Sequence, residues 1–382
     1  MTLSLHSVAV ADAVRTPIGK RDGALRHLPV EQLVAPLIRA LIRRYPSLQD
    51  GVDEVILGNA AGPGGNIARL SALEAGLPVT VPGVTVDRQC GSGLEAINLG
   101  ARLIQTGAAN VVIAGGVEST STAPLRADRT QEHEKTPQFY GRARFVPAVL
   151  GDPDMGIAAE NVAARFGITR AEADQFALNS HRKTVQMLGS GAFDRELVAV
   201  NHIDTDECYR ADCSLGALRS LKPVFKADGQ VTAGNACPVN DGACLVLLAS
   251  AELADSLFKS EQKPLYFRAA TAVGVDPHYL GIGPVPATTR LLQQLDLTIN
   301  DVHQIEITEA FAAQVLACQQ QLQIRDEALN PFGGALALGH PYGASGALLV
   351  SRLFHGLPRG ETGIATLGIG GGMGLSSAFT RE

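Results

Sequence analysis

Short runs rich in Val and Ile alternate along the chain with longer stretches in which Ala and Leu recur at helical spacing. Within residues 30–44, Leu33, Leu37 and Leu41 recur at every fourth position, which places them on one face of a helix. This alternation is typical of an α/β protein built on a mainly parallel sheet. The expected strands are Ser7–Val14, Val52–Leu57, Gly83–Val86, Asn110–Ala114 and Cys244–Leu248. The expected helices are Val30–Arg44, Ile67–Ala75, Gly93–Thr106, Met155–Phe166 and Thr169–Leu188, the last with Thr169 as its N-cap.

The pattern changes between Thr120 and Arg144, where the chain is polar, charged and poor in periodicity. A stretch of this length inside a compact enzyme is typical of a segment that passes over an active site. The alternative interpretation is a plain surface loop.

The last third of the chain repeats the order of the first third. VHQIEI at 302–307 corresponds to VDEVIL at 52–57, and GHPYGASGALLVSRLFHG at 339–356 corresponds to CGSGLEAINLGARLIQTG at 90–107. GIATLGIGGGMG at 363–374 then corresponds to NVVIAGGVES at 110–119. We therefore predict two similar βαβ-type halves packed face to face, with a loop domain inserted between them.

Composition excludes several classes of protein. A net charge of −6 over 382 residues argues against a nucleic-acid binder, which normally carries a basic face. Apolar runs fall short of the roughly 18 residues that span a bilayer, and the first residues lack the pattern of a secretory signal. Six cysteines without a CxxC pair form neither a disulfide framework nor a zinc site. We expect a reduced, cytoplasmic protein without a bound metal.

Cys90 is a candidate nucleophile. It follows a predicted strand, and Gly91-Ser92-Gly93 then opens an apolar-periodic helix. A thiol at a helix N-terminus is stabilised as thiolate by the helix dipole and by unpaired N–H groups. The alternative is a buried structural cysteine.

His340 lies in the corresponding loop of the second half, where Ser345 and Gly346 again open a helix. Duplicated halves place such loops opposite each other, so Cys90 and His340 would form an activated nucleophile pair. A histidine with a purely structural role is the alternative.

Two further loops carry candidate residues. The run Gly368–Gly374 has neither the GxGxxG spacing nor a Walker motif, so we favour an oxyanion hole of backbone N–H groups over nucleotide hydrolysis. Thr308-Glu309-Ala310-Phe311 follows a predicted strand, at the end where α/β proteins bind ligands. Glu309 has either a structural or a functional role there.

Many motifs in this order resemble the thiolase family, the CoA-dependent enzymes that make or cleave 3-ketoacyl-CoA. The resemblance covers essentially the whole chain, with VRTPIGK, QCGSG, GGVES, MGIAAENVA, LKPVFKADGQVTAGN, NDGA, GIGPVPAT, TEAFAAQVLA, NPFGGALALGHPYGASG and IGGGMG. It implies a five-layered αβαβα thiolase fold with an N-terminal half at 1–117 and 239–262, a CoA-binding loop domain at 118–238 and a C-terminal half at 263–382.

The resemblance also implies residue roles. Cys90 would accept the acyl group, His340 would activate it, and Gly370 with the Cys90 amide would form the oxyanion hole. The loop domain would bind CoA through the region 221–235. The positions expected to line the CoA and acyl pocket are Leu221, Ala233, Cys237, Met155 and Phe311.

Two departures from the family pattern affect the same half-reaction. Gly368 stands where the family has the cysteine that exchanges a proton with the α-carbon, and Thr308 stands where it has an asparagine that holds a water for the enolate. Cys237 replaces a serine that usually faces pantetheine.

Three functions follow. The first is a thiolase-type acyltransferase with a modified proton-transfer site. The second is an acyl-enzyme former that passes acyl groups to water, a thiol or a carrier protein without carbon–carbon chemistry. The third is a non-catalytic CoA-binding scaffold. The resemblance further implies acetyl-CoA as substrate rather than a covalently bound cofactor, a role in lipid metabolism and a homodimer or homotetramer.

Overall fold

The computed structural model describes residues 5–129, 136–257 and 263–382. The parts of the predictions that concern residues 1–4, 130–135 and 258–262 lie outside these ranges. The first half contains the strands β1 (Val8–Arg15), β2 (Gly19–Lys20), β3 (Glu54–Gly58), β4 (Gly83–Val86), β5 (Val111–Ser119) and β8 (Asn240–Ser250). Its helices are α1 (Val30–Arg44), α2 (Leu48–Gly51), α3 (Ile67–Ala75), α4 (Ser92–Gln105) and α8 (Ala251–Leu257). The predicted elements of this half are confirmed, with ends that differ by up to a few residues.

The second half repeats this order, as the sequence predicts. Its strands are β9 (Leu265–Gly274), β10 (Gln304–Ile307), β11 (Thr362–Ile369) and β12 (Met373–Arg381). Its helices are α9 (Pro284–Leu295), α10 (Ala312–Leu322), α11 (Ala335–Leu338) and α12 (Tyr342–Gly356), with short 3-10 turns η2 (Pro277–Ile282) and η3 (Ile299–Asp301).

Strand order shows the duplication directly. The strand order in the sheet is β10-β11-β12-β9-β1-β8-β5-β3-β4. Counted outward from the β9–β1 contact, equivalent strands of the two halves follow in the same order. The expectation of a mainly parallel sheet is wrong. Only β3–β4, β3–β5 and β10–β11 pair in parallel among the described strands, and the other neighbours are antiparallel. The long β8 is buried on both faces and therefore has the continuous apolar sequence of a parallel strand.

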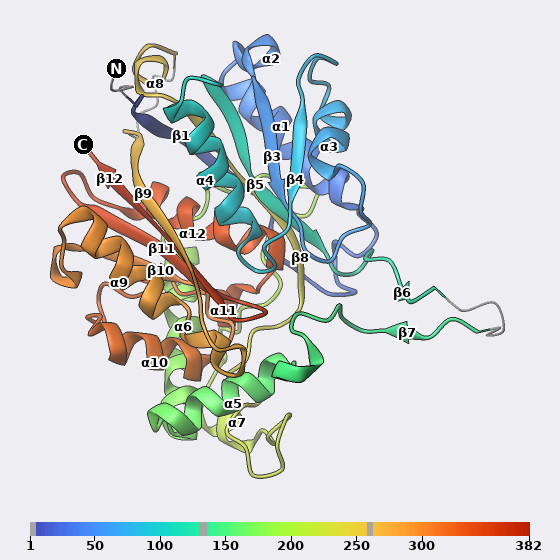
Figure 1. The fold of residues 1–382 in the computed structure, drawn as a ribbon, viewed down its shortest axis with the longest axis vertical. Coiled ribbons are helices and arrows are strands. Elements are labelled where there is room, and N and C mark those ends of the chain that lie inside the picture. The colour runs from blue at the N-terminus through green and yellow to red at the C-terminus, as the bar shows by residue number, and fades with distance from the viewer. Residues whose placement is uncertain (1–4, 130–135, 258–262) are drawn as a thin grey trace.

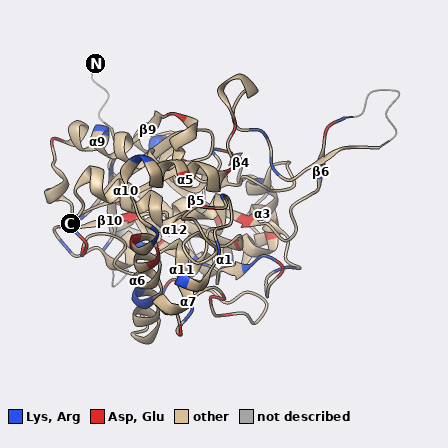
Figure 2. Ribbon diagram, turned by 90° about the horizontal axis from the view of Figure 1, so that it is seen from below, with Lys and Arg blue, Asp and Glu red and all other residues tan. Residues whose placement is uncertain are grey.

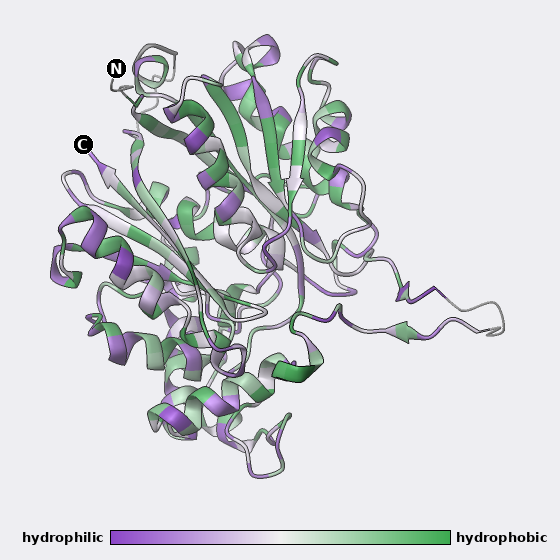
Figure 3. Ribbon diagram, in the orientation of Figure 1, coloured by the Kyte–Doolittle hydropathy of each residue, from purple (hydrophilic) through white to green (hydrophobic). Residues whose placement is uncertain are grey.

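The core has five layers (Figure 1). Helices α1 and α3 cover the outer face of the first half of the sheet, and α9 and α10 cover that of the second half. Helices α4 and α12 pack between the two inner faces, with Ile97 and Leu353 fully buried there. Figure 3 shows hydrophobic residues concentrated on the strands and on these central helices. Each large side chain buried in this way contributes about 1.5–3 kcal/mol.

The inserted segment contains β6 (Arg126–Ala127), β7 (Phe139–Tyr140), η1 (Ala148–Leu150), α5 (Met155–Phe166), α6 (Arg170–Gly189) and α7 (Leu215–Ser220). The predicted N-cap is confirmed, because Thr169 and Glu172 form a complete capping box. Strands β6 and β7 pair with each other and project away from the body of the molecule (Figure 1). The prediction that residues 120–144 pass over an active site is therefore wrong for this hairpin.

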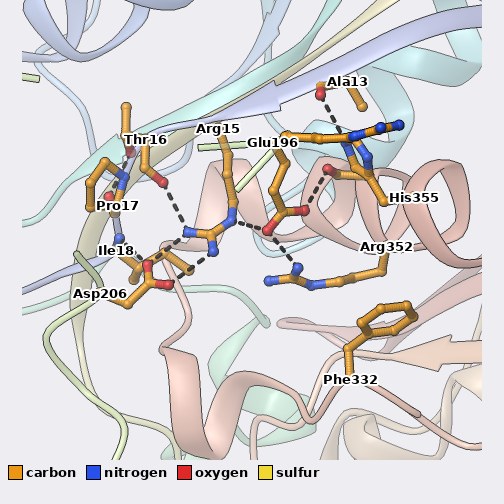
Figure 4. A network of polar contacts seen from close by, with 12 residues as sticks. Ala13, Arg15, Thr16, Pro17, Ile18, Glu196, Asp206, Phe332, Arg352 and His355 are labelled. Atoms are coloured by element: carbon orange, nitrogen blue, oxygen red, sulfur yellow. Dashed lines mark hydrogen bonds and ion pairs between the residues drawn. The ribbon is translucent and has the colours of Figure 1, made fainter. Parts of the chain in front are cut away.

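A buried ion network fastens the inserted segment to both halves (Figure 4). Arg15 of β1 contacts Glu196 at 2.6 Å and Asp206 at 2.7 Å, and Arg352 of α12 contacts the same Glu196 oxygen at 2.5 Å. Burial alone raises the pKa of Glu196, but Arg352 and Arg15 outweigh it and hold that pKa at about 2. Breaking a buried pair of this kind typically costs about 3–5 kcal/mol.

Acidic and basic positions are interspersed along the ribbon in Figure 2. Each helix within the described residues is too short or too polar to cross a lipid bilayer.

Candidate active site

The two duplicated helices meet at their first turns. A Cβ added at Gly93 of α4 would lie 2.5 Å from the carbonyl oxygen of Gly343 in α12, and one added at Gly346 would collide with the backbone of Leu94. Because neither glycine has a side chain, the two helix N-termini touch. The loops that precede them, which carry Cys90 and His340, therefore lie beside each other.

Cys90 lies on a tight strand-to-helix turn after β4. Gln89, just before it, has a φ of 48°, and its amide donates to Asp87 at 2.7 Å. Ser92 locks the turn, because its hydroxyl accepts from the Arg88 amide at 2.9 Å and donates to the Gln89 carbonyl at 2.6 Å. A left-handed residue held by its surroundings is frequent where a turn presents a reactive side chain.

The thiol of Cys90 is half-buried, and it receives hydrogen bonds from two backbone amides, those of Gly370 and of Cys90 itself. Burial, together with the charges of Glu118 and Asp87, nevertheless outweighs the effect of those amides and raises its pKa to about 11. The expectation of a resting thiolate is therefore wrong, because desolvation outweighs the helix N-terminus. The sulfur must lose its proton at the moment it reacts.

His340 is fully buried and held on both sides. Its amide donates to Asn240 at 2.8 Å, and its Nδ1 lies 2.5 Å from the Ser345 hydroxyl. That hydroxyl donates its one hydrogen to the Pro341 carbonyl, so Nδ1 carries the ring hydrogen and Nε2 has a free lone pair. Burial lowers the pKa of His340 to about 4. The imidazole is thus neutral and able to accept a proton.

The glycine-rich run forms the hairpin between β11 and β12. Gly371 and Gly372 have φ values of 86° and 83°, which lets Gly370 direct its N–H at Cys90. Phe145 covers this hairpin, since a Cβ at Gly370 would lie 2.8 Å from its ring. Asp152 fixes that segment by accepting from Arg142 at 2.9 Å and from the Phe145 amide at 3.2 Å. The inserted segment therefore passes over the site at Phe145, just after the predicted range.

Gly368 and Thr308 lie on neighbouring strand ends near this hairpin. A Cβ at Gly368 would come within 3.0 Å of the Leu280 carbonyl oxygen, so the backbone of η2 fills most of the space beside it. Thr308 is 4% exposed, and within the described residues its hydroxyl has no hydrogen-bond partner. Thr308 and Ser345 both line a cavity of about 40 Å³.

Glu309 has a structural role. Its carboxylate accepts from Ser180 at 2.7 Å, from Asn330 at 2.9 Å and from the Leu336 amide at 3.1 Å. It therefore fixes the loop after β10 to α6 and α11.

The positions predicted to line a CoA pocket form a partly exposed apolar strip. Phe225 packs on Gly156, next to Met155, and its ring meets that of Phe311 edge-on at 6.3 Å. Leu221 packs against Gly234, beside the exposed Ala233. Leu221 and Phe225 remain 37% and 38% exposed. Residue 311 forms a β-bridge to Ala236, so the strip ends beside Cys237.

Sequence reasoning assigned no role in the site to several residues that build it. Asn240 and Ser345 hold His340, Phe145 covers Gly370, and the Tyr342 ring packs against His340 at 5.1 Å. Glu118 joins the loop after β3 to the start of α12, because it accepts from the amides of Ala60, Ala61 and Gly343 and from the Asn59 side chain. NDGA and GGVES, which contain Asn240 and Glu118, were the available signals. Across the described ranges no group of His, Cys, Asp or Glu is placed to hold a metal ion.

A duplicated five-layered fold with a cysteine and a histidine at its two central helix starts defines a thiolase-type acyltransferase. The N-terminal thiolase domain matches residues 8–252 and the C-terminal thiolase domain matches residues 263–381. The chain belongs to the thiolase family.

Relatives agree over the whole length. The chain is 46% identical to VraB of Staphylococcus aureus strain COL, a proposed acetyl-CoA C-acetyltransferase, over 99% of this chain and all of that protein. The structure of the Bacillus anthracis acetyl-CoA acetyltransferase is similar with a TM-score of 0.92 at 38% identity, and 99% of each chain is covered. Human mitochondrial 3-ketoacyl-CoA thiolase in complex with CoA gives a TM-score of 0.90 at 33% identity, also over 99% of each chain.

Proposed function

We propose that this protein is an acyl-CoA C-acyltransferase that makes or cleaves 3-ketoacyl-CoA through an acyl group carried on Cys90. The observation that carries this proposal is the contact between the first turns of α4 and α12, which follow Cys90 and His340, together with the Gly370 and Cys90 amides that lower the pKa of the Cys90 thiol. Donors placed there can stabilise the oxyanion that forms when the sulfur attacks a thioester carbonyl. The substrate assignment rests on the relatives, which include an acetyl-CoA acetyltransferase and a thiolase bound to CoA.

Acylation begins from a neutral pair. The Cys90 thiol has a pKa of about 11 and His340 one of about 4, so both are uncharged near neutral pH. As the sulfur attacks the acyl carbonyl carbon, its proton passes to Nε2 of His340. Ser345 keeps the ring oriented by accepting from Nδ1. The CoA thiolate then leaves and takes the proton from His340, which leaves an acyl-Cys90.

The apolar strip forms the part of the site that would bind the acyl-CoA substrate. The positions that would contact the pantetheine arm and the acyl group are Leu221, Ala233, Met155, Phe311 and Cys237. The strip leads from exposed residues to Cys237, whose pKa is raised by a charge on Cys90. CoA is a substrate in this proposal, and no covalently bound cofactor is required.

The carbon–carbon half of the reaction uses a modified proton-transfer site. Gly368 has no side chain to move a proton, and the Thr308 hydroxyl is buried and free to hold a water for the enolate. The lack of a side chain at 368 favours a second candidate, an acyl-enzyme former that passes the group to water, a thiol or an acyl carrier protein. A non-catalytic CoA-binding scaffold is the third, and the converging amides at Cys90 argue against it.

One pair of assays on the wild-type protein separates these functions. Intact-mass analysis after mixing with acetyl-CoA should show one acetyl group, which the Cys90→Ser variant should lack. Thiolysis of acetoacetyl-CoA should then be measurable. Acylation without thiolysis would favour the second candidate, and the absence of any acylation would leave only the scaffold.

A homodimer or homotetramer in the cytoplasm is the expected form. Strand β4 lies at one edge of the sheet, and apolar residues of β4 and the neighbouring α3 are exposed, with Val84 of β4 at 39% and Leu70 of α3 at 47%. An unpaired edge with apolar side chains favours association with a second copy. The molar mass measured by analytical ultracentrifugation should therefore be at least that of a dimer. The domain limits 1–117 with 239–262, 118–238 and 263–382 remain a prediction.

A further inference from the structure

Cleavage of a 3-ketoacyl-CoA needs an acid at the α-carbon, C2, in addition to the base that serves Cys90. When the C2–C3 bond breaks, the electron pair remains on C2 as an enolate, and a proton must be delivered there. His340 is oriented by Ser345 and acts on the Cys90 sulfur, while Gly368 offers no side chain. Another group at the site must supply the acid.

Few ionisable side chains act electrostatically on Cys90 or respond to it in the described structure. They are Asp87, Glu118, Tyr342 and Cys237. Glu118 already accepts four hydrogen bonds from the loops that it fixes. Asp87 is exposed and accepts from the Gln89 amide. Tyr342 packs its ring edge-on against His340.

Cys237 lies between the loop that follows β10 and the loop that carries His340. Its amide donates to the Ala310 carbonyl at 2.9 Å, and the Ala312 amide donates to the Asn235 carbonyl at 2.9 Å. Two residues further on, Val239 forms a β-bridge with His340. The segment 235–239 is thus paired at one end with the loop after β10 and at the other with the histidine loop. Cys237, like Cys90, is an only partly buried residue.

We propose that the Cys237 thiol is the acid and base that acts on C2, in the role that a glycine at 368 cannot fill. The inference rests on the proposed function. In thiolysis, Cys90 gives its proton to His340 and its sulfur attacks C3. The C2–C3 bond breaks with its electron pair on C2, and the Cys237 S–H donates its proton there, which releases acetyl-CoA.

The second half of the cycle restores both thiols. The incoming CoA thiol gives its proton to the Cys237 thiolate, and the CoA sulfur attacks the carbonyl of acyl-Cys90. Cys90 leaves as thiolate and recovers its proton from His340. Condensation is the reverse, with the Cys237 thiolate removing a proton from C2 of acetyl-CoA.

The electrostatics of the pair suit this role. Burial raises the pKa of Cys237, and a negative charge on Cys90 raises it further. The resting Cys237 is therefore protonated and ready to act as an acid. Cys90 is uncharged at rest and stays so once it carries an acyl group, so no charge on Cys90 opposes ionisation of Cys237 at the stage where condensation needs a base.

The decisive variant is Cys237→Ser, which keeps a small polar side chain but cannot ionise at accessible pH. We expect acylation of the variant by acetyl-CoA to be unchanged by intact mass. Thiolysis of acetoacetyl-CoA, and exchange of the acetyl-CoA α-protons into deuterated water, should each fall about 10²–10⁴-fold. Cys213→Ser, at a half-buried thiol beside α7, is the matched control and should change neither reaction.

Three outcomes would overturn the proposal. The first is a Cys237→Ser enzyme that cleaves and exchanges at the wild-type rate. The second is loss of exchange in Tyr342→Phe but not in Cys237→Ser, which would assign the proton to the phenol. The third is a wild-type protein that is acylated yet neither cleaves nor exchanges, which would leave acyl transfer standing and remove any role for Cys237 at C2. Failure of the proposed function differs from all three, because acylation itself would then be absent.

Discussion

A thiol added at residue 368 should restore carbon–carbon chemistry to a protein that has lost Cys237. Gly368 pairs with Gly374 in the β11–β12 ladder, and its φ lies outside the left-handed region, so the backbone accepts a side chain. A Cβ there would lie 3.0 Å from the Leu280 carbonyl oxygen and 3.3 Å from the Gly281 Cα. These neighbours must yield by a few tenths of an ångström, and such crowding costs about 1–3 kcal/mol of stability.

The expected gain follows from the role of the lost group. We compare Cys237→Ser with the double variant Cys237→Ser/Gly368→Cys, using acetoacetyl-CoA thiolysis and α-proton exchange. The added thiol should raise both by about 10²-fold, the lower end of what general acid–base catalysis contributes, because crowding displaces it slightly. Gly368→Cys alone should change thiolysis little, since Cys237 already acts there.

The matched control is Cys237→Ser/Gly368→Ala, which adds the Cβ without the sulfur. It should show the same loss of stability in urea unfolding and no gain in rate. The reasoning fails if the cysteine double variant folds and is acylated by acetyl-CoA but gains no thiolysis, or if alanine restores the rate as well as cysteine does.

Three further predictions concern the neutral pair and the buried network. Because the pKa of Cys90 is about 11, its alkylation by iodoacetamide should increase steadily with pH from neutrality toward that value; a plateau below pH 8 would show a resting thiolate instead. Ser345→Ala should slow acylation about 10–100-fold at unchanged KM, because an unpaired buried ring nitrogen costs about 1–3 kcal/mol; an unchanged rate would contradict the orienting role. Glu196→Gln should lower the free energy of unfolding by about 3 kcal/mol at pH 7, since Arg352 and Arg15 hold the pKa of Glu196 at about 2, below its usual 4.5. That contribution is fully present above pH 4.5 and is lost as pH falls through about 2. The free energies of unfolding of wild type and variant, measured in urea at acid pH, should therefore converge. A difference that persists there would refute the assignment.

Local sequence determined the elements and the positions of the chemistry. The apolar periodicity places α1, and the Thr169–Glu172 box places the start of α6, because both depend on neighbours within a few residues. The repeated loop-to-helix pattern also predicted that the loops carrying Cys90 and His340 lie opposite each other. Two copies of one βαβ arrangement bring equivalent loops together whatever their details.

Tertiary structure decided what those residues can do. The helix start at Cys90 favours a thiolate, yet burial raises its pKa to about 11, because desolvation depends on every segment packed around the sulfur. The antiparallel pairing of β8 could not be predicted from its sequence, because burial on both faces gives it the continuous apolar pattern of a parallel strand. Phe145 lies over Gly370, and Cys237 lies between the loop after β10 and the loop of His340. These contacts join residues that are more than 70 positions apart in the chain, so no local pattern encodes them.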